Sequence, residues 1–234
     1  MYEGKNKKSK MTLQRYNFDF AITSYCQARC RSCARMDHDK NDGSVSPYIT
    51  LEHFDIEVFK KIISTSDYIK ERNGYILFCG ELGDPMMHPD IEEFIDVGMY
   101  YGGGVQVNTN GGLRQPKWYS YMANKYKNNE KDLEFTFGVD GTDHDTNWKY
   151  REGVIFERAL ANMREWFGAD GDGHWHYLIF DWNYHQIPDA LTLAYQLNAP
   201  IGFKFNNREH GLITDEHKKI ALEMLKICDG RIVP

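Results

Sequence analysis

The sequence has few cysteines, no long apolar run and no excess of basic residues, and each shortage excludes a class of protein. Five cysteines in 234 residues are too sparse and too odd in number for a disulfide framework, and no secretory signal opens the sequence. No run of about 18 apolar residues exists, so we expect no membrane-spanning segment. The formal net charge of −6 disfavours nucleic acid as a partner, because phosphate neutralisation needs clustered Lys and Arg. Without a disulfide framework the cysteines are expected to be reduced thiols, which predicts a cytoplasmic protein.

The composition allows one large domain with small appendages. Hydrophobic residues make up 41% of the chain, which is ample for a core. The one basic cluster lies near the N-terminus, and we expect residues 1–14 to form a disordered, solvated tail. Residues 15–209 are expected to form the folded core, and residues 210–234 a helical C-terminal extension.

Two kinds of segment alternate along the core. Short stretches rich in β-branched or aromatic residues predict strands at 17–25, 74–79, 104–109, 133–139, 175–181 and 201–206. Apolar residues spaced three or four apart predict helices at 51–70, 90–101, 116–128, 154–167, 187–198 and 214–228. The last helix has an N-cap signal at Thr214 and Asp215. Six β-then-α units in series predict an α/β fold with parallel strands, a partial (β/α)6 barrel of the TIM type.

Three of the five cysteines lie within eight residues, at Cys26, Cys30 and Cys33, directly after the first predicted strand. Three thiolates on one loop can hold three irons of a cubane cluster and leave the fourth iron without a protein ligand. A structural zinc site is the alternative, and it needs a fourth ligand. His38 is the only nearby candidate for that ligand.

Polar or glycine-rich residues follow each predicted strand. Ligands of such folds bind at the carboxyl ends of the strands, so we expect these segments to share one rim. The cysteine loop follows the first strand, and the segments after the second to sixth strands are residues 80–85, 108–112, 140–141, 181–183 and 206–207.

The cysteine loop resembles that of the radical S-adenosylmethionine (radical SAM) superfamily. In that family the free iron chelates the amino and carboxylate groups of S-adenosylmethionine (SAM), and the reduced cluster cleaves SAM to a 5′-deoxyadenosyl radical. The resemblance covers residues 17–207. It implies two cofactors, a [4Fe-4S] cluster on the three cysteines and SAM, together with an external electron donor of the flavodoxin or ferredoxin type.

Residues 78–85 resemble the family's "GGEP" motif, with Gly83-Asp84-Pro85 in the place of Gly-Glu-Pro. In relatives this segment meets the SAM ammonium with carbonyls and a carboxylate. The resemblance therefore implies SAM contacts at Gly80, Gly83, Asp84 and Pro85. Asp is shorter than Glu, so an indirect role for Asp84 also stays open.

Two further short segments match the family. Thr109-Asn110-Gly111 is similar to the Thr-Asn-Gly at the end of the third strand in many members, and we expect SAM contacts at Asn110 and at Asn108 just before it. Asn183 lies in a segment that resembles the one whose backbone contacts adenine.

Residues 137–153 are similar to the Ser-x-Asp-Gly…His-Asp…Arg-x-Gly run of the subgroup with SPASM or twitch auxiliary domains. This similarity implies Asp140 and Arg151 as contacts, with Arg151 favoured by its charge for the SAM carboxylate or ribose. Gly138 stands where the subgroup has Ser, and Ser32 stands where most members have an aromatic residue.

The C-terminus departs from the subgroup, whose barrel is followed by a cysteine-rich auxiliary domain. Residues 210–234 are the start of a truncated auxiliary domain or a plain helical extension. Cys228 is accordingly the first ligand of such a domain or a buried thiol, and the second reading is favoured.

Several other residues have a less specific pattern. His174 and His176 have strand spacing, which places them on one side, and a polar strand face is expected there. Cys79 precedes the glycine motif, which would place it near the cluster, but alternation predicts that it points into the core. Tyr177, Lys204 and Asn206 are candidates to reach the barrel interior and touch substrate.

The expected function is therefore that of a radical SAM enzyme, of the oxidoreductase or lyase type. It would cleave SAM reductively and abstract a hydrogen atom from a small-molecule or peptide substrate that the sequence does not identify. Two alternatives remain: a non-catalytic module that binds the cluster or SAM, and a zinc-stabilised structural protein.

Overall fold

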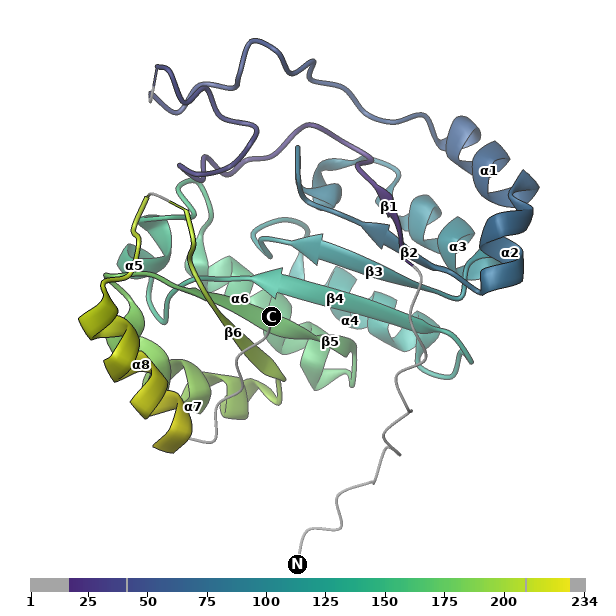
Figure 1. Ribbon diagram of the computed structural model, residues 1–234. Helices are drawn as coiled ribbons and strands as arrows, with labels where there is room; N and C mark the ends of the chain where they lie inside the picture. The colour runs from purple at the N-terminus through teal and green to yellow at the C-terminus, as the bar shows by residue number, and fades with distance from the viewer. Residues whose placement is uncertain (1–16, 41, 209, 228–234) are drawn as a thin grey trace, which may run out of the picture.

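The computed structural model describes residues 17–40, 42–208 and 210–227, which form a parallel sheet with helices packed against it (Figure 1). The strands lie in the order β1-β2-β3-β4-β5-β6, and all neighbouring pairs are parallel. Their bounds are β1 Asn17–Phe20, β2 Tyr75–Phe78, β3 Gly104–Thr109, β4 Asp132–Gly138, β5 Asp172–Ile179 and β6 Ile201–Phe205. The predicted fold class, a partial (β/α)6 barrel with parallel strands, is confirmed.

Helices connect successive strands, as the alternation predicts. They are α1 Ile56–Thr65, α2 Asp67–Arg72, η1 Pro85–Met87, α3 Ile91–Tyr101, α4 Pro116–Tyr126, α5 His144–Trp148, α6 Phe156–Gly168, η2 Tyr184–Gln186, α7 Ile187–Leu197 and α8 Asp215–Ile227, where η marks a 3₁₀ turn. The predicted start of the last helix is confirmed, because the Thr214 hydroxyl accepts a hydrogen bond from the His217 amide at 3.2 Å. None of the described helices has the length and apolar character needed to cross a membrane.

One predicted helix, 51–70, is wrong in its extent. Helix α1 begins only at Ile56, because the Asp55 carboxylate accepts hydrogen bonds from the amides of Glu57 and Val58 at 2.8 and 3.0 Å. The segment then divides at Ser66, whose hydroxyl caps α2. The five-residue helix α5 was not predicted, since it is too short to show a periodic apolar pattern.

The two faces of the sheet differ in chemistry. In β3, Val105 and Val107 are fully buried, whereas Gln106 between them is only partly buried. Helices α3, α4 and α6 lie behind the sheet in Figure 1, and no described helix covers its front. Helix α3 lies so close to β3 that a Cβ atom on Gly98 would be 2.7 Å from a Val105 methyl group. The apolar side chains therefore face the helices, and the polar side chains face the uncovered side.

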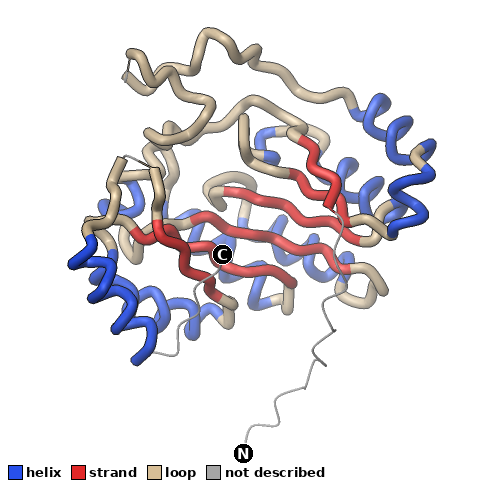
Figure 2. Tube along the Cα trace, viewed as in Figure 1, coloured by secondary structure: helices blue, strands red, loops and turns tan. Residues whose placement is uncertain are grey.

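The segment between β1 and α1 is almost entirely loop and arches over the carboxyl ends of the strands (Figure 2). It contains all three clustered cysteines. The cysteines thus lie at the carboxyl ends of the strands, where the sequence predicts a shared rim of polar segments. The predicted tail at residues 1–14 and Cys228 lie outside the described residues, and the domain boundaries stay predictions.

Candidate functional site

The base of the cysteine loop is fixed to the segment before α1. The Ser24 hydroxyl donates to the Thr50 carbonyl at 2.8 Å and accepts from the Glu52 amide at 2.7 Å. The Phe54 amide donates to the Ile22 carbonyl at 2.9 Å. These contacts hold both ends of the long loop together, so the cysteines leave β1 in a defined direction.

A buried arginine shapes the loop from inside. Arg35 is 5% exposed, and its guanidinium donates to the carbonyls of Cys26 and Ala28 at 3.1 and 2.7 Å. A hydrogen bond from a charged donor is stronger than one from a neutral donor. The chain therefore wraps around Arg35 between the first and second cysteines.

All three cysteines are free thiols with different surroundings. Cys30 is buried, whereas Cys26 and Cys33 are partly exposed. Hydrogen-bond donors approach two of the sulfurs. The Ala28 amide is 3.4 Å and the Asn110 Nδ2 atom 3.6 Å from Cys26 Sγ, and the Arg151 Nη1 atom is 4.0 Å from Cys30 Sγ. Such donors stabilise a thiolate and tune a metal bound to it.

Burial keeps two of these thiols protonated in the absence of metal. It raises the pKa of Cys26 to about 12, with the Asp84 carboxylate adding to the effect. It also raises the pKa of Cys30, which the guanidinium of Arg151 opposes. A metal ligand must be the thiolate, so metal binding at this loop would release protons.

The donor set fits an iron–sulfur cluster. Each cysteine of a cubane cluster binds a different iron, so three sulfurs on one short loop suffice, without convergence on a single point. Within residues 17–40, 42–208 and 210–227, no three Cys, His, Asp or Glu side chains are placed to hold one metal ion together. The zinc alternative would need exposed His38 as the fourth ligand.

Gly83 fits directly beneath the cysteine loop. A Cβ atom at this position would lie 2.3 Å from the Thr23 carbonyl oxygen and 2.6 Å from that of Tyr25. The next amide, that of Asp84, donates to the Tyr25 carbonyl at 2.9 Å. Glycine is therefore required here by close backbone approach. Gly80 has more room, since its nearest contact would be the Gly83 carbonyl at 3.3 Å.

Asp84 is buried, and its carboxylate is engaged inside the protein. It accepts from the Thr109 hydroxyl at 3.0 Å, the Asn110 amide at 2.8 Å and the Met86 amide at 3.0 Å. Burial raises the pKa of Asp84, and these three donors oppose the rise. Asp84 therefore joins the loop after β2 to the end of β3, and buried Pro85 follows as the first residue of η1.

Asn110 connects the end of β3 to the cysteine loop. Its side-chain amide exchanges hydrogen bonds with that of Gln27, at 2.7 and 3.3 Å, in addition to approaching Cys26. Gln27 was not singled out in the sequence, although its position between two candidate ligands was a usable signal. Asn108 lies on the uncovered face, where its side-chain oxygen accepts from Gln106 at 3.2 Å.

Asp140 and Asn183 are both fully buried and hold the ends of β4 and β5 together. The Asp140 carboxylate accepts from the Leu178 amide at 2.7 Å and from the Arg151 Nε atom at 2.7 Å. The side-chain Nδ2 atom of Asn183 donates to the carbonyls of Asp140 and Leu178 at 3.0 and 2.9 Å. Of this group, Arg151 alone reaches the cysteine loop.

Loop contacts bridge the open side of the barrel at the rim. Arg208, after β6, donates to the Ser32 carbonyl at 2.6 Å and lies 3.3 Å from the Tyr150 hydroxyl. The Arg29 amide donates to the Glu152 carbonyl at 2.8 Å. The cysteine loop is thus held by segments that follow β4 and β6. Sequence reasoning missed Arg208, because no local pattern links it to a residue 176 positions away.

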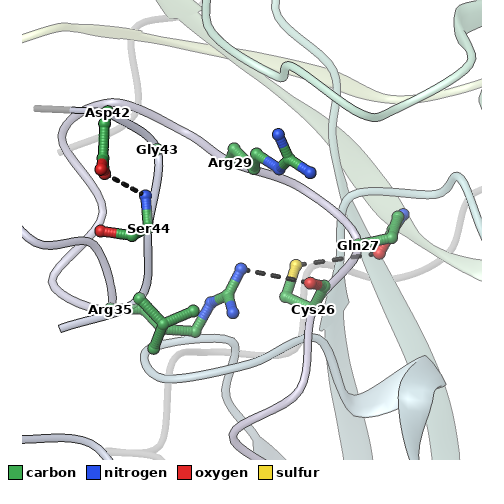
Figure 3. Close-up of a pocket in the computed structure, with 8 residues that line it drawn as sticks. Cys26, Gln27, Arg29, Arg35, Asp42, Gly43 and Ser44 are labelled. Atoms are coloured by element: carbon green, nitrogen blue, oxygen red, sulfur yellow. Dashed lines mark hydrogen bonds between the residues drawn. The ribbon is translucent and has the colours of Figure 1, made fainter. Parts of the chain in front are cut away.

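A pocket of about 550 Å³ opens between the cysteine loop and residues 42–45 (Figure 3). Figure 3 shows Cys26 on one side and Asp42 to Ser44 on the other, with the guanidinium groups of Arg29 and Arg35 between them. The pocket therefore joins a candidate iron ligand to a polar, cationic lining.

The uncovered face carries further polar side chains, and here some expectations were wrong. His174 and His176 do share one side, with ring centroids 6.3 Å apart, and both alternate with fully buried aromatic residues. Tyr177 is one of these buried residues. Its hydroxyl donates to the Asn183 carbonyl, so it lies in the core and not in the barrel interior.

Two more placements differ from those expected. Cys79 is half-buried, and its neighbour Phe78 occupies the core position instead, so the prediction for Cys79 is wrong. Asn206 is buried, and its side-chain Nδ2 atom donates to the carbonyls of Arg208 and His210 within its own loop. Lys204 is partly buried in β6.

Acidification is expected to destabilise the protein through His88. This residue is 2% exposed; its Nδ1 atom accepts from the Asp90 amide at 3.1 Å, which leaves Nε2 to donate to the Phe54 carbonyl at 2.9 Å. Burial lowers the pKa of His88 below the value of about 6.5 in an unfolded chain. The unfolded state therefore binds the proton first. Stability is complete above that unfolded pKa and falls below it by up to about 1.4 kcal/mol per pH unit.

Urea denaturation at neutral and mildly acidic pH checks this expectation. His88→Gln should lose less stability on acidification than the wild type, because one buried proton-binding group is removed. Part of the loss should remain, since burial also lowers the pKa values of His174 and His176. The exposed control His38→Gln should behave as the wild type. An undiminished loss in His88→Gln would contradict the assignment.

No protein-family model matches the chain, and no curated protein sequence matches it. Solved structures do. SuiB from Streptococcus suis, bound to S-adenosylmethionine, is 11% identical with a TM-score of 0.66, over 93% of this chain and 49% of SuiB. The protein anSMEcpe with bound AdoMet is 10% identical with a TM-score of 0.65, over 93% of this chain and 62% of that one.

A radical SAM methyltransferase from Sphaerobacter thermophilus is also similar, at 12% identity and a TM-score of 0.60, over 95% of this chain and 67% of that one. At these identities the likeness shows the fold. The chain thus has the fold of radical SAM proteins, as its motifs predict, and it spans about half to three-fifths of the length of SuiB and anSMEcpe.

Proposed function

We propose that this chain is the core of a radical SAM enzyme that cleaves SAM reductively and abstracts a hydrogen atom from a substrate. One observation carries the proposal: three free thiols of one eight-residue segment lie where the carboxyl ends of six parallel strands meet. The likeness in fold to structures that contain SAM supports it.

Cys26, Cys30 and Cys33 would hold the cluster. When bound, a [4Fe-4S] cluster supplies the electron that cleaves SAM, after reduction by a flavodoxin- or ferredoxin-type donor. The chain's own part is to fix the loop and to direct donors at its sulfurs, from Asn110 and Arg151.

The rim residues would divide into two roles toward SAM. Arg151 and Asn108 have partly exposed side chains and suit direct contact, Arg151 with a carboxylate. The backbone at Gly80 has room for a close approach by the ammonium group, whereas the space at Gly83 is already filled by the carbonyls of Thr23 and Tyr25. Asp84, Asp140 and Asn183 are buried and already hydrogen-bonded, so we assign them to positioning these segments.

The substrate would lie against the uncovered face of the sheet. This face offers polar side chains, which favours a polar small molecule or peptide segment: Gln106, Asn108, Thr136, His174, His176 and Lys204. SuiB has been solved with its precursor peptide SuiA, and anSMEcpe with a Cp18Cys peptide, which supports a peptide as one of the two classes. An oxidoreductase or lyase outcome and a reducing, cytoplasmic setting for the thiols belong to the same proposal.

Anaerobic reconstitution tests the proposal. Protein incubated with iron and sulfide should turn brown and retain iron, and with dithionite and SAM it should form 5′-deoxyadenosine. Transfer of deuterium from a labelled candidate substrate into 5′-deoxyadenosine would identify the substrate class. Iron uptake and SAM binding without any 5′-deoxyadenosine would contradict the enzyme and favour the non-catalytic module. Zinc without iron would favour the structural alternative.

A further inference from the structure

Gly138, at the end of β4, leaves a space that another side chain fills. A Cβ atom at this position would lie 2.7 Å from Arg151 Nη2 and 3.3 Å from Arg151 Cζ. A contact under 3.0 Å forces one of the partners to move. A serine at position 138 and the guanidinium in its present place are therefore incompatible.

The guanidinium is oriented by its ion pair with Asp140. Its Nε atom donates to Asp140 Oδ2 at 2.7 Å, and Asp140 has no exposed surface. The other oxygen of that carboxylate accepts from the Leu178 amide at 2.7 Å, so the anion itself is fixed. The Arg151 amide donates to the Asn147 carbonyl at 2.8 Å, which fixes the arginine backbone. Asp140 thus sets the orientation of the cation, and Gly138 leaves room for it.

From this position the cation faces the most buried of the three cysteines. Arg151 Nη1 is 4.0 Å from Cys30 Sγ, and Cys30 is 8% exposed. The amide of Arg29 binds the carbonyl of Glu152, so each segment is held where the cation meets the sulfur. A charge beside a buried sulfur is weakly screened by water, and the Asp140 carboxylate, which lies on the far side of the ion pair, offsets only part of its effect on the sulfur.

We propose that Arg151, in addition to its proposed contact with SAM, raises the reduction potential of the cluster through Cys30, and that Gly138 is the residue that gives the guanidinium its place. This inference rests on the proposed function. Reduction adds one electron from the external donor and hence one negative charge to the cluster. A fixed cation beside a ligand sulfur stabilises the reduced state more than the oxidised state. The electron then reaches the cluster from a less strongly reducing donor.

The test is the midpoint potential of the reconstituted protein without SAM, from a redox titration followed by electron paramagnetic resonance. Arg151→Gln is expected to shift the potential to a more negative value. Arg151→Lys should retain part of the wild-type value, because it keeps the charge. Gly138→Ser should move the potential toward that of Arg151→Gln, although the arginine is still present. Lys149→Gln is the matched control, since it removes an exposed cation from the same segment, and its potential should equal the wild type.

The outcomes separate this inference from the proposed function. Wild-type protein that forms 5′-deoxyadenosine, with Arg151→Gln at the wild-type potential, would overturn the inference alone. A wild-type potential in Gly138→Ser would overturn the role of Gly138. Wild-type protein that takes up no cluster would overturn both. Should Arg151→Gln fail to fold or to load iron, Arg151→Lys and Gly138→Ser still decide the question, with iron content and thermal melting measured for each.

Discussion

Replacing Cys30 by alanine is expected to abolish stable cluster uptake and to reduce 5′-deoxyadenosine formation to background. Cys30 is the central and most buried of the three thiols, and its sulfur alone faces Arg151. Two cysteines would leave two irons without protein ligands, and a cubane with two such positions is expected to be lost. Iron and sulfide analysis after anaerobic reconstitution, followed by an assay for 5′-deoxyadenosine, measures both effects.

The chain supplies its own control for this result. Cys79 is also a free thiol, half-buried at the end of β2, but it is outside the cysteine loop. Cys79→Ala should bind iron and cleave SAM as the wild type does. Equal activity of the wild type and Cys30→Ala would remove the basis of the enzyme proposal. Equal losses in Cys30→Ala and Cys79→Ala would show that the alanine substitutions act by damaging the fold.

Replacing Asp84 by alanine is expected to lower the free energy of unfolding by roughly 3–5 kcal/mol, even without cluster or SAM. The carboxylate is buried and accepts hydrogen bonds from the Thr109 hydroxyl and from the amides of Met86 and Asn110. Alanine would leave these donors buried without partners, and each such donor costs about 1–3 kcal/mol. Chemical denaturation of the metal-free protein measures the change.

This result distinguishes a positioning role for Asp84 from direct contact with SAM. A carboxylate that only touched SAM would leave the metal-free protein as stable as the wild type when it is removed. Asp84→Asn keeps the size of the side chain but turns one acceptor into a donor, so it should also be destabilised. The exposed control Asp39→Ala should unfold as the wild type does. Wild-type stability in Asp84→Ala would refute the positioning role.

The sequence by itself determined the six strands and the main helices between them, but not the division at Ser66 or the short helix α5. Alternation along β3 places Val105 and Val107 on one side and Gln106 on the other, and this pattern depends only on neighbouring residues. The apolar spacing of the helices is equally local, as is the clustering of three cysteines after β1. Once six β-then-α units are recognised, the rules for parallel sheets bring the strand ends to one rim.

The tertiary structure decided what each rim residue does. The sequence singled out Asp84, Asp140 and Arg151, but only the fold shows that Arg151 alone of the three reaches a cysteine sulfur. It also shows that Gly138, a departure from the family pattern, makes the space for that arginine.

Contacts of this kind join residues far apart in the chain, such as Arg208 and Ser32, which are separated by 176 positions. Local patterns fix which side of an element a residue occupies, because backbone periodicity is a property of a few neighbouring residues. The partner it meets there depends on how the strands and loops pack around it, and that packing exists only in the folded chain.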